Sequence, residues 1–81
     1  HGGLLMALAD FSLATSAMRN SDKPVTTVSF HSEFIRPAPL GSLLEVRAKV
    51  TKKGKSLAFS EGNIKVDDDV ILNFGGVVKI L

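Results

Sequence analysis

The chain has 81 residues, of which 44% are hydrophobic and 22% charged, and it carries a formal net charge of +2 and no cysteine. This length fits one small domain and excludes two, and the absence of cysteine excludes disulfides and thiolate metal sites. The basic residues are scattered apart from Lys52, Lys53 and Lys55, and Trp and Tyr are both absent, so we expect no nucleic-acid surface.

Residues 3–18 predict a helix, because they contain good helix formers and no proline. Hydrophobic side chains fall on nearly every side of this helix, so we expect other structure to wrap it. The apolar run from Leu4 to Leu8 is followed closely by Asp10 and has no basic segment before it, which argues against a signal peptide or membrane span and favours a cytoplasmic protein. The turn-forming segment 19–24 then ends the helix.

After this segment the hydrophobic period changes to two, which is typical of strands. The first predicted strand runs from Val25 to Ile35. Its alternation puts Thr26, Val28 and Phe30 on one face, and Val25, Thr27 and Ser29 on the other. The segment 36–41 carries two prolines and a glycine and therefore predicts a stiff loop.

Three further strands are expected over 44–51, 56–66 and 70–81, with turns at Lys53–Gly54 and at 67–69. The three adjacent aspartates of the second turn favour a solvated turn, because a calcium loop needs alternating oxygen ligands. The predicted fold class is α+β: one long helix followed by a four-stranded antiparallel meander that curls around it. Apolar surface is left over, and we expect a second copy of the chain to cover it.

Asp10 is the one charged residue between His1 and Arg19, and it lies about two turns into the predicted helix. A buried carboxylate without a partner is costly, so this group is expected to meet a partner, to be protonated, or to line a cleft that holds water and substrate. We favour the cleft, which makes Asp10 a candidate functional residue. The alternative is a carboxylate that points to solvent or caps a neighbouring loop.

The segment His1-Gly2-Gly3 directly precedes the helix. The first backbone N–H groups of a helix have no internal partner, and the helix dipole favours negative charge there, so Gly2 is a candidate oxyanion donor. The alternative is a flexible entry loop. Gly2 and Asp10 are eight positions apart, roughly 12 Å along a helix, so two antiparallel helices of a symmetric dimer would be needed to bring them together.

Three stretches, in this order, carry a resemblance to a known family: HGGLLMALAD at 1–10, VSFHSEFIRPA at 28–38 and KGKSLAF at 53–59, with Gly41 between the last two. They resemble the hotdog-fold acyl-CoA thioesterases of the phenylacetate-degradation (PaaI-like) type. The resemblance implies an enzyme that hydrolyses acyl-CoA to free acid and CoA, with a helix inside a curled antiparallel sheet. It also implies a homodimer or a dimer of dimers, and neither metal nor cofactor.

By position, the resemblance implies that Asp10 acts as general base or as nucleophile and that the N–H of Gly2 polarises the thioester carbonyl. Thr27 falls where the family often has a Ser or Thr that positions the attacking water, and Thr26 takes this place if the alignment shifts by one. The implied substrate-binding residues are His1, Gly3, Phe34, Arg36, Pro37, Leu40, Lys53 and Lys55. The lysines and Arg36 would contact CoA phosphates, and the apolar residues would line the channel; ordinary surface and packing roles are the alternatives.

Members of this family carry a further segment with a first strand ahead of the HGG motif. We therefore expect residues 1–81 to form a single hotdog domain that lacks its N-terminal part. Two other functions compete with hydrolysis. A hydratase needs a His paired with an acid, which His1 and Asp10 do not suggest, whereas a noncatalytic acyl-CoA-binding or dimerisation module would need no role for Asp10.

Overall fold

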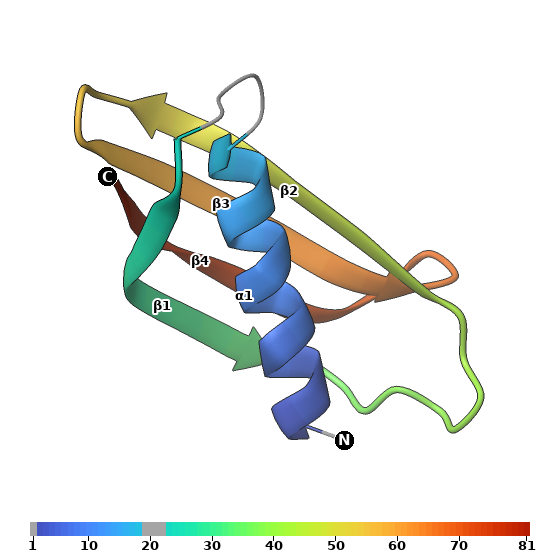
Figure 1. Ribbon diagram of the computed structural model, residues 1–81. Helices are drawn as coiled ribbons and strands as arrows, with labels where there is room; N and C mark the ends of the chain where they lie inside the picture. Colours follow the sequence, from blue (N-terminus) through green and yellow to red (C-terminus); the bar gives the residue numbers. More distant parts are fainter. Residues whose placement is uncertain (1, 19–22) are drawn as a thin grey trace.

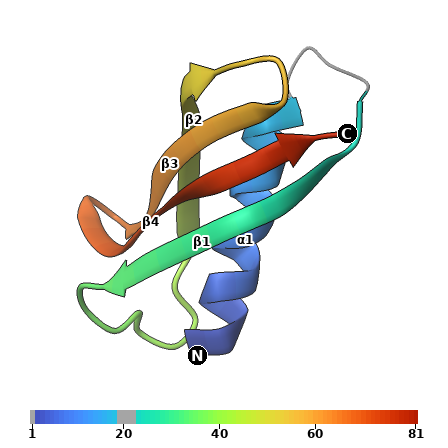
Figure 2. The same ribbon diagram turned by 90° about the vertical axis from the view of Figure 1, so that its left-hand side faces the viewer.

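The computed structural model describes residues 2–18 and 23–81 and consists of one helix and four strands (Figure 1). The helix α1 spans Gly2–Met18. The strands are β1 (Val25–Phe34), β2 (Leu44–Lys53), β3 (Leu57–Val66) and β4 (Asp69–Ile80). All pairings are antiparallel, and the sheet curls around α1 (Figure 2), which confirms the predicted α+β architecture.

The strand order is β1-β4-β3-β2, so the predicted four-stranded meander is wrong in one respect. β2, β3 and β4 do form a meander, but β1 pairs with β4 instead of β2. The segment 35–43, with its prolines, is too stiff and too long for a hairpin turn, and it carries the chain past the N-terminal end of α1 to the far edge of the sheet (Figures 1 and 2). β1 and β2 are therefore the two edges of the sheet.

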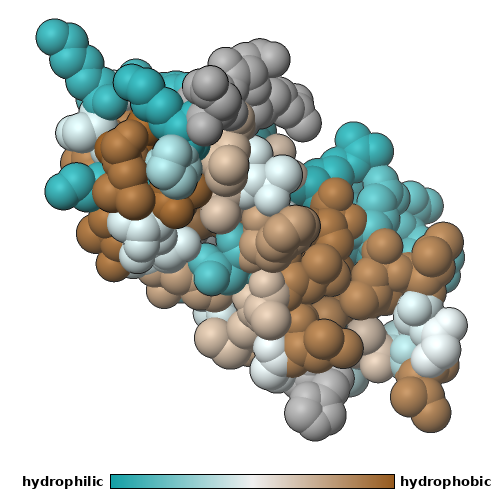
Figure 3. Space-filling model, in the orientation of Figure 1, coloured by the Kyte–Doolittle hydropathy of each residue, from teal (hydrophilic) through white to brown (hydrophobic). Residues whose placement is uncertain are grey.

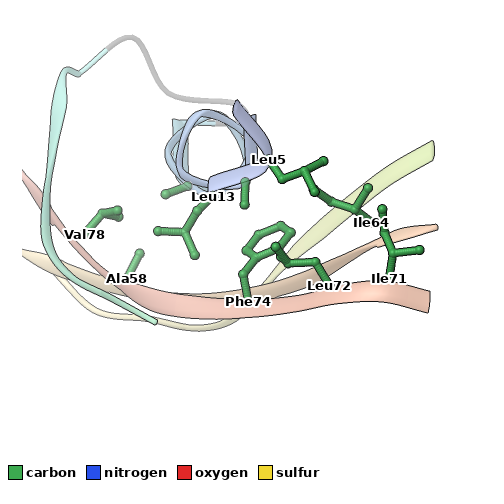
Figure 4. Close-up of a cluster of buried hydrophobic side chains, with 10 residues drawn as sticks. Leu5, Leu13, Ala58, Ile64, Ile71, Leu72, Phe74 and Val78 are labelled. Carbon is green, nitrogen blue, oxygen red and sulfur yellow. The ribbon is translucent and has the colours of Figure 1, made fainter. Parts of the chain in front are cut away.

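The core lies between one stripe of α1 and the inner face of the sheet (Figure 4). The stripe repeats every four residues and is at most 7% exposed: Leu5, Ala9, Leu13 and Ala17. It packs on buried side chains of β3 and β4, namely Ala58, Ile64, Leu72, Phe74 and Val78. Each large side chain buried in this way stabilises the fold by about 1.5–3 kcal/mol, so this layer fixes where α1 lies on the sheet.

A polar pair also joins α1 to the sheet. The hydroxyl of Ser16 lies 3.3 Å from that of Ser60, which is 4% exposed. Ser16 additionally donates to the carbonyl of Leu13, as helix hydroxyls commonly do. Ser60 lies on β3, and this contact gives its buried hydroxyl a hydrogen-bond partner within an otherwise apolar layer.

The opposite face of α1 is apolar and exposed. Leu4 is 69%, Phe11 70% and Met18 38% exposed. Figure 3 shows hydrophobic surface gathering over the N-terminal half of α1 and the neighbouring loop. The sheet covers one side of the helix, and the expectation that this helix is hydrophobic nearly all round is confirmed. Within residues 2–18 and 23–81, no helix is long and apolar enough to cross a lipid bilayer.

Candidate active site

Asp10 is half-buried on the flank of α1 that faces β1. The hydroxyl of Thr27 donates a hydrogen bond to Oδ1 of Asp10 at 3.0 Å. Two residues separated by 17 positions are thus brought together by the packing of α1 on β1. A carboxylate can accept about four hydrogen bonds, so this bond orients the group and leaves capacity for further donors.

The structure distinguishes the two threonines that the sequence offered. Thr27 is half-buried and faces α1, whereas Thr26 is exposed on the other side of the strand. Neighbouring residues of a strand point to opposite faces, so only one of them can reach the helix. It is Thr27 that contacts Asp10.

The predicted facing of β1 is wrong beyond Thr27 because the strand contains a bulge. The pairing passes from Thr27 opposite Val78 to Ser29 opposite Val77, so Val28 is left without a partner on β4. Val28 and Ser29 are both exposed, and Phe30 faces the core together with Thr27. Regular alternation from Val25 onward cannot reveal this extra residue, because each half of the strand alternates correctly by itself.

The glycine segment lies at the N-terminal end of α1. Gly2 is the first residue of the helix, Gly3 is exposed in the first turn, and His1 lies outside the described residues. A Cβ atom added to Gly3 would meet nothing within 4 Å, so the space beside this turn is open. Gly2 lies eight positions before Asp10 in the same helix, which is roughly 12 Å, so a single chain does not bring the two together.

The remaining site candidates lie at two opposite ends of the sheet. Phe34 ends β1 and Pro37 follows in the loop beside the N-terminus of α1, and both are exposed (Figure 1). Lys53 and Lys55 are exposed at the β2–β3 turn, at the other end of a molecule that is 40 Å long. The structure therefore does not gather these residues into one site within one chain.

Two further candidates, Leu40 and Arg36, lie in the loop between β1 and β2. Leu40 is fully exposed in the loop between β1 and β2. Arg36, which the sequence offered as a phosphate contact, pairs at 3.7 Å with Asp69 at the start of β4, and both side chains are more than half exposed. Such a pair contributes little to stability, so Arg36 can exchange this partner for another anion.

A broad hollow of about 1010 Å³ on the sheet was not expected from the sequence. Its lining comes from all four strands and includes His31, Glu33, Arg47, Glu61 and Asn73. In the part of the chain that the structure describes, α1 contributes no residue to it, so this hollow lies on the face turned away from the helix. Asp10 and Thr27 are consequently separate from it, and the small, water-accessible flank of α1 is the better candidate for chemistry.

Comparison with known proteins points to a single family. Residues 1–72 match the family model described as Thioesterase superfamily. A protein of Pseudomonas aeruginosa named "Putative esterase PA0474" is 34% identical over 82 residues, which is 99% of this chain and 61% of that protein. Human acyl-coenzyme A thioesterase 13 is 36% identical over 62 residues, covering 74% of this chain and 44% of the human protein.

The fold has solved counterparts as well. The PaaI protein from the phenylacetic acid degradation operon of Escherichia coli superposes with a TM-score of 0.92 at 26% identity, over 100% of this chain and 59% of that protein. The chain therefore spans 44–61% of the length of the relatives named above.

Proposed function

This chain belongs to the thioesterase superfamily, and from that membership we propose that it hydrolyses the thioester of an acyl-coenzyme A to a free acid and CoA. The substrate class is supported by the relatives named as acyl-CoA thioesterases, at 34–36% identity. The observation that carries the proposal is the 3.0 Å hydrogen bond from Thr27 to Asp10 on the open flank of α1. It holds a carboxylate in one orientation where water and substrate have access.

Asp10 would act on an ester that is already activated. In the general-base route, Asp10 takes a proton from water while the water oxygen bonds to the acyl carbon, and the C–S bond then breaks to release CoA thiolate, which takes up a proton. In the nucleophile route, the Asp10 carboxylate bonds to the acyl carbon and the C–S bond breaks to release CoA thiolate, which takes up a proton. Water then hydrolyses the mixed anhydride to the free acid and restores the Asp10 carboxylate. Thr27 serves both routes by fixing the carboxylate through Oδ1.

Backbone N–H groups at the Gly2 end of a second copy would stabilise the negative charge that develops on the carbonyl oxygen. The exposed stripe of Leu4, Phe11 and Met18 supports a homodimer, or a dimer of dimers, in which two helices lie side by side. His1, Gly3, Phe34 and Pro37 would then line the substrate channel, with Lys53 and Lys55 at the CoA phosphates. One hotdog domain over 1–81 and a cytoplasmic location belong to the same proposal.

Replacing Asp10 by asparagine tests the proposal. Asp10→Asn keeps the shape and removes the base, so we expect kcat for acyl-CoA hydrolysis to fall about 100-fold or more while substrate binding and assembly are kept. Thiol release from a panel of acyl-CoAs, measured on the full-length protein, provides the assay. Glu61→Gln, an equivalent change on the opposite sheet face, is the control and should retain kcat within about twofold. Undiminished hydrolysis by Asp10→Asn would remove Asp10 from the mechanism.

A noncatalytic acyl-CoA-binding or dimerisation module is the second candidate. It is supported by the finding that the chain spans only 44–61% of the length of the relatives described above. Calorimetric binding of acyl-CoA without any thiol release, in the parent protein and in Asp10→Asn alike, would support this module over the enzyme.

A further inference from the structure

The bulge in β1 lies directly beside the Asp10–Thr27 pair. Thr27 is the last residue in regular pairing before it, and Val28, 59% exposed, is the extra residue. A bulge bends a strand and increases its twist, and Figure 1 shows β1 turning sharply near its middle. The Thr27 hydroxyl that reaches Asp10 therefore lies at the bend itself.

Burial of apolar residues does not explain why this strand carries an extra residue. If Val28 were absent, Thr27, Ser29 and Phe30 would alternate regularly, with Thr27 and Phe30 still facing α1. The pairs Thr27–Val78 and Ser29–Val77 would also be kept. What Val28 adds is the bend, and the bend sets the angle at which Thr27 approaches the helix.

A glycine on the neighbouring strand accommodates the backbone at this point. Gly76 of β4 lies opposite Phe30, and a Cβ atom built on it would overlap the carbonyl oxygen of Ser29. The same atom would lie 3.2 Å from Cα of Phe30 and 3.3 Å from Cδ2 of Leu13. β1, β4 and α1 thus meet at a position where any side chain would push the bulged strand or the helix away.

We infer that the Val28 bulge and Gly76 are positioning elements that place the hydroxyl of Thr27 against Asp10. Neither residue touches the reacting atoms; both act through Thr27. The inference rests on the proposed function for its catalytic consequence, but the placement itself can be measured without turnover.

The kinetic test combines deletion of Val28 with Thr27→Val in the full-length protein. We expect the deletion to keep fold and assembly, to lower kcat about tenfold and to change KM less than about twofold. Thr27→Val should also lower kcat about tenfold in the parent. In the deletion variant it should lower kcat no further, because the bulge acts through this hydroxyl. Losses that multiply, or an unchanged kcat after deletion, would overturn the inference.

A glycine pair tests the same inference with intact strand length. Gly76→Ala crowds the bulge, whereas the control Gly62→Ala, on β3, crowds the carbonyl of Arg47 on β2 and the ring of Phe74 on β4. Both variants should lose stability, and at a temperature where both are folded only Gly76→Ala should lose kcat. Equal kcat in the two variants would contradict the role of Gly76.

Methyl NMR separates this inference from the proposed function. In the parent, Asp10→Asn should shift the γ-methyl resonance of Thr27, and after deletion of Val28 it should not. If the shift is lost as expected while Thr27→Val leaves kcat unchanged, the placement stands and the catalytic role fails. If the shift persists without Val28, the placement is wrong even in an active thioesterase.

Discussion

The inward and outward faces of α1 are built from similar residues but have different surroundings. Inward, Leu5, Ala9, Leu13 and Ala17 are at most 7% exposed on the sheet, whereas outward, Leu4 and Phe11 are about 70% exposed. Composition alone therefore does not determine which face of this helix is core; the limited width of the sheet does. Asp10 lies on the flank between the two faces, where a charge keeps access to water.

The largest expected effect comes from opening the inward face. Leu13 is fully buried, so Leu13→Ala should lower the free energy of unfolding by about 3 kcal/mol, within the 2–5 kcal/mol range of such changes. Urea unfolding at several protein concentrations measures it, and this cost should not vary with concentration. The matched variant Leu4→Ala should lose stability only at concentrations where copies associate. An equal, concentration-independent cost for Leu4→Ala would show that the two faces are equally covered within one chain.

The next effect concerns the outward face. Phe11→Gln removes the one aromatic side chain of α1, which is 70% exposed, and should weaken self-association at least about tenfold, because large aromatic anchors carry much of an interface's free energy. Sedimentation velocity over a dilution series measures the dissociation constant. Glu61→Gln, exposed on the sheet face turned away from α1, is the control and should leave the dissociation constant unchanged. A folded parent that stays monomeric at micromolar concentration would contradict the proposed dimer.

A smaller loss of stability is expected where α1 meets the sheet through a polar contact. Ser60→Ala removes the buried hydroxyl that meets Ser16 and should cost about 1 kcal/mol, against the larger cost of losing Leu13. Thermal unfolding measures this difference, and Ser42→Ala in the exposed loop region serves as a surface reference. A gain in stability for Ser60→Ala would mean that the polar pair costs more to bury than it returns.

Much of this fold could be predicted from the sequence because local signals dominate it. The helix begins one residue earlier than expected and ends at Met18 as predicted, since good helix formers are followed by turn residues and Pro24. β2 also follows its alternation, although it continues to Lys53. In contrast, the place of β1 beside β4 depends on the path of the loop 35–43, and no local pattern encodes that path.

The candidate site was predictable only in part. Asp10 stands out as a lone charge in an apolar helix, and the family resemblance pointed to Thr27, which the structure places beside it. The bulge at Val28 was missed because each half of β1 alternates correctly by itself, and because Gly76, which accommodates the bulge, lies on another strand. The proposed approach of Gly2 to Asp10 would need a second copy, whose position the sequence of one chain does not specify.

The position of β4 has a consequence for how the chain acquires its structure during synthesis. Among the four described strands, β4 leaves the ribosome after the other three, yet it lies between β1 and β3. β2 and β3 can pair as a local hairpin at once, while β1 waits for partners that lie much further along the chain, as in the pairs Phe34–Leu72 and Val25–Ile80. Until then the buried stripe of α1 lacks its contacts with Leu72, Phe74 and Val78 of β4, so nascent chains stalled before β4 should be preferred clients of chaperones.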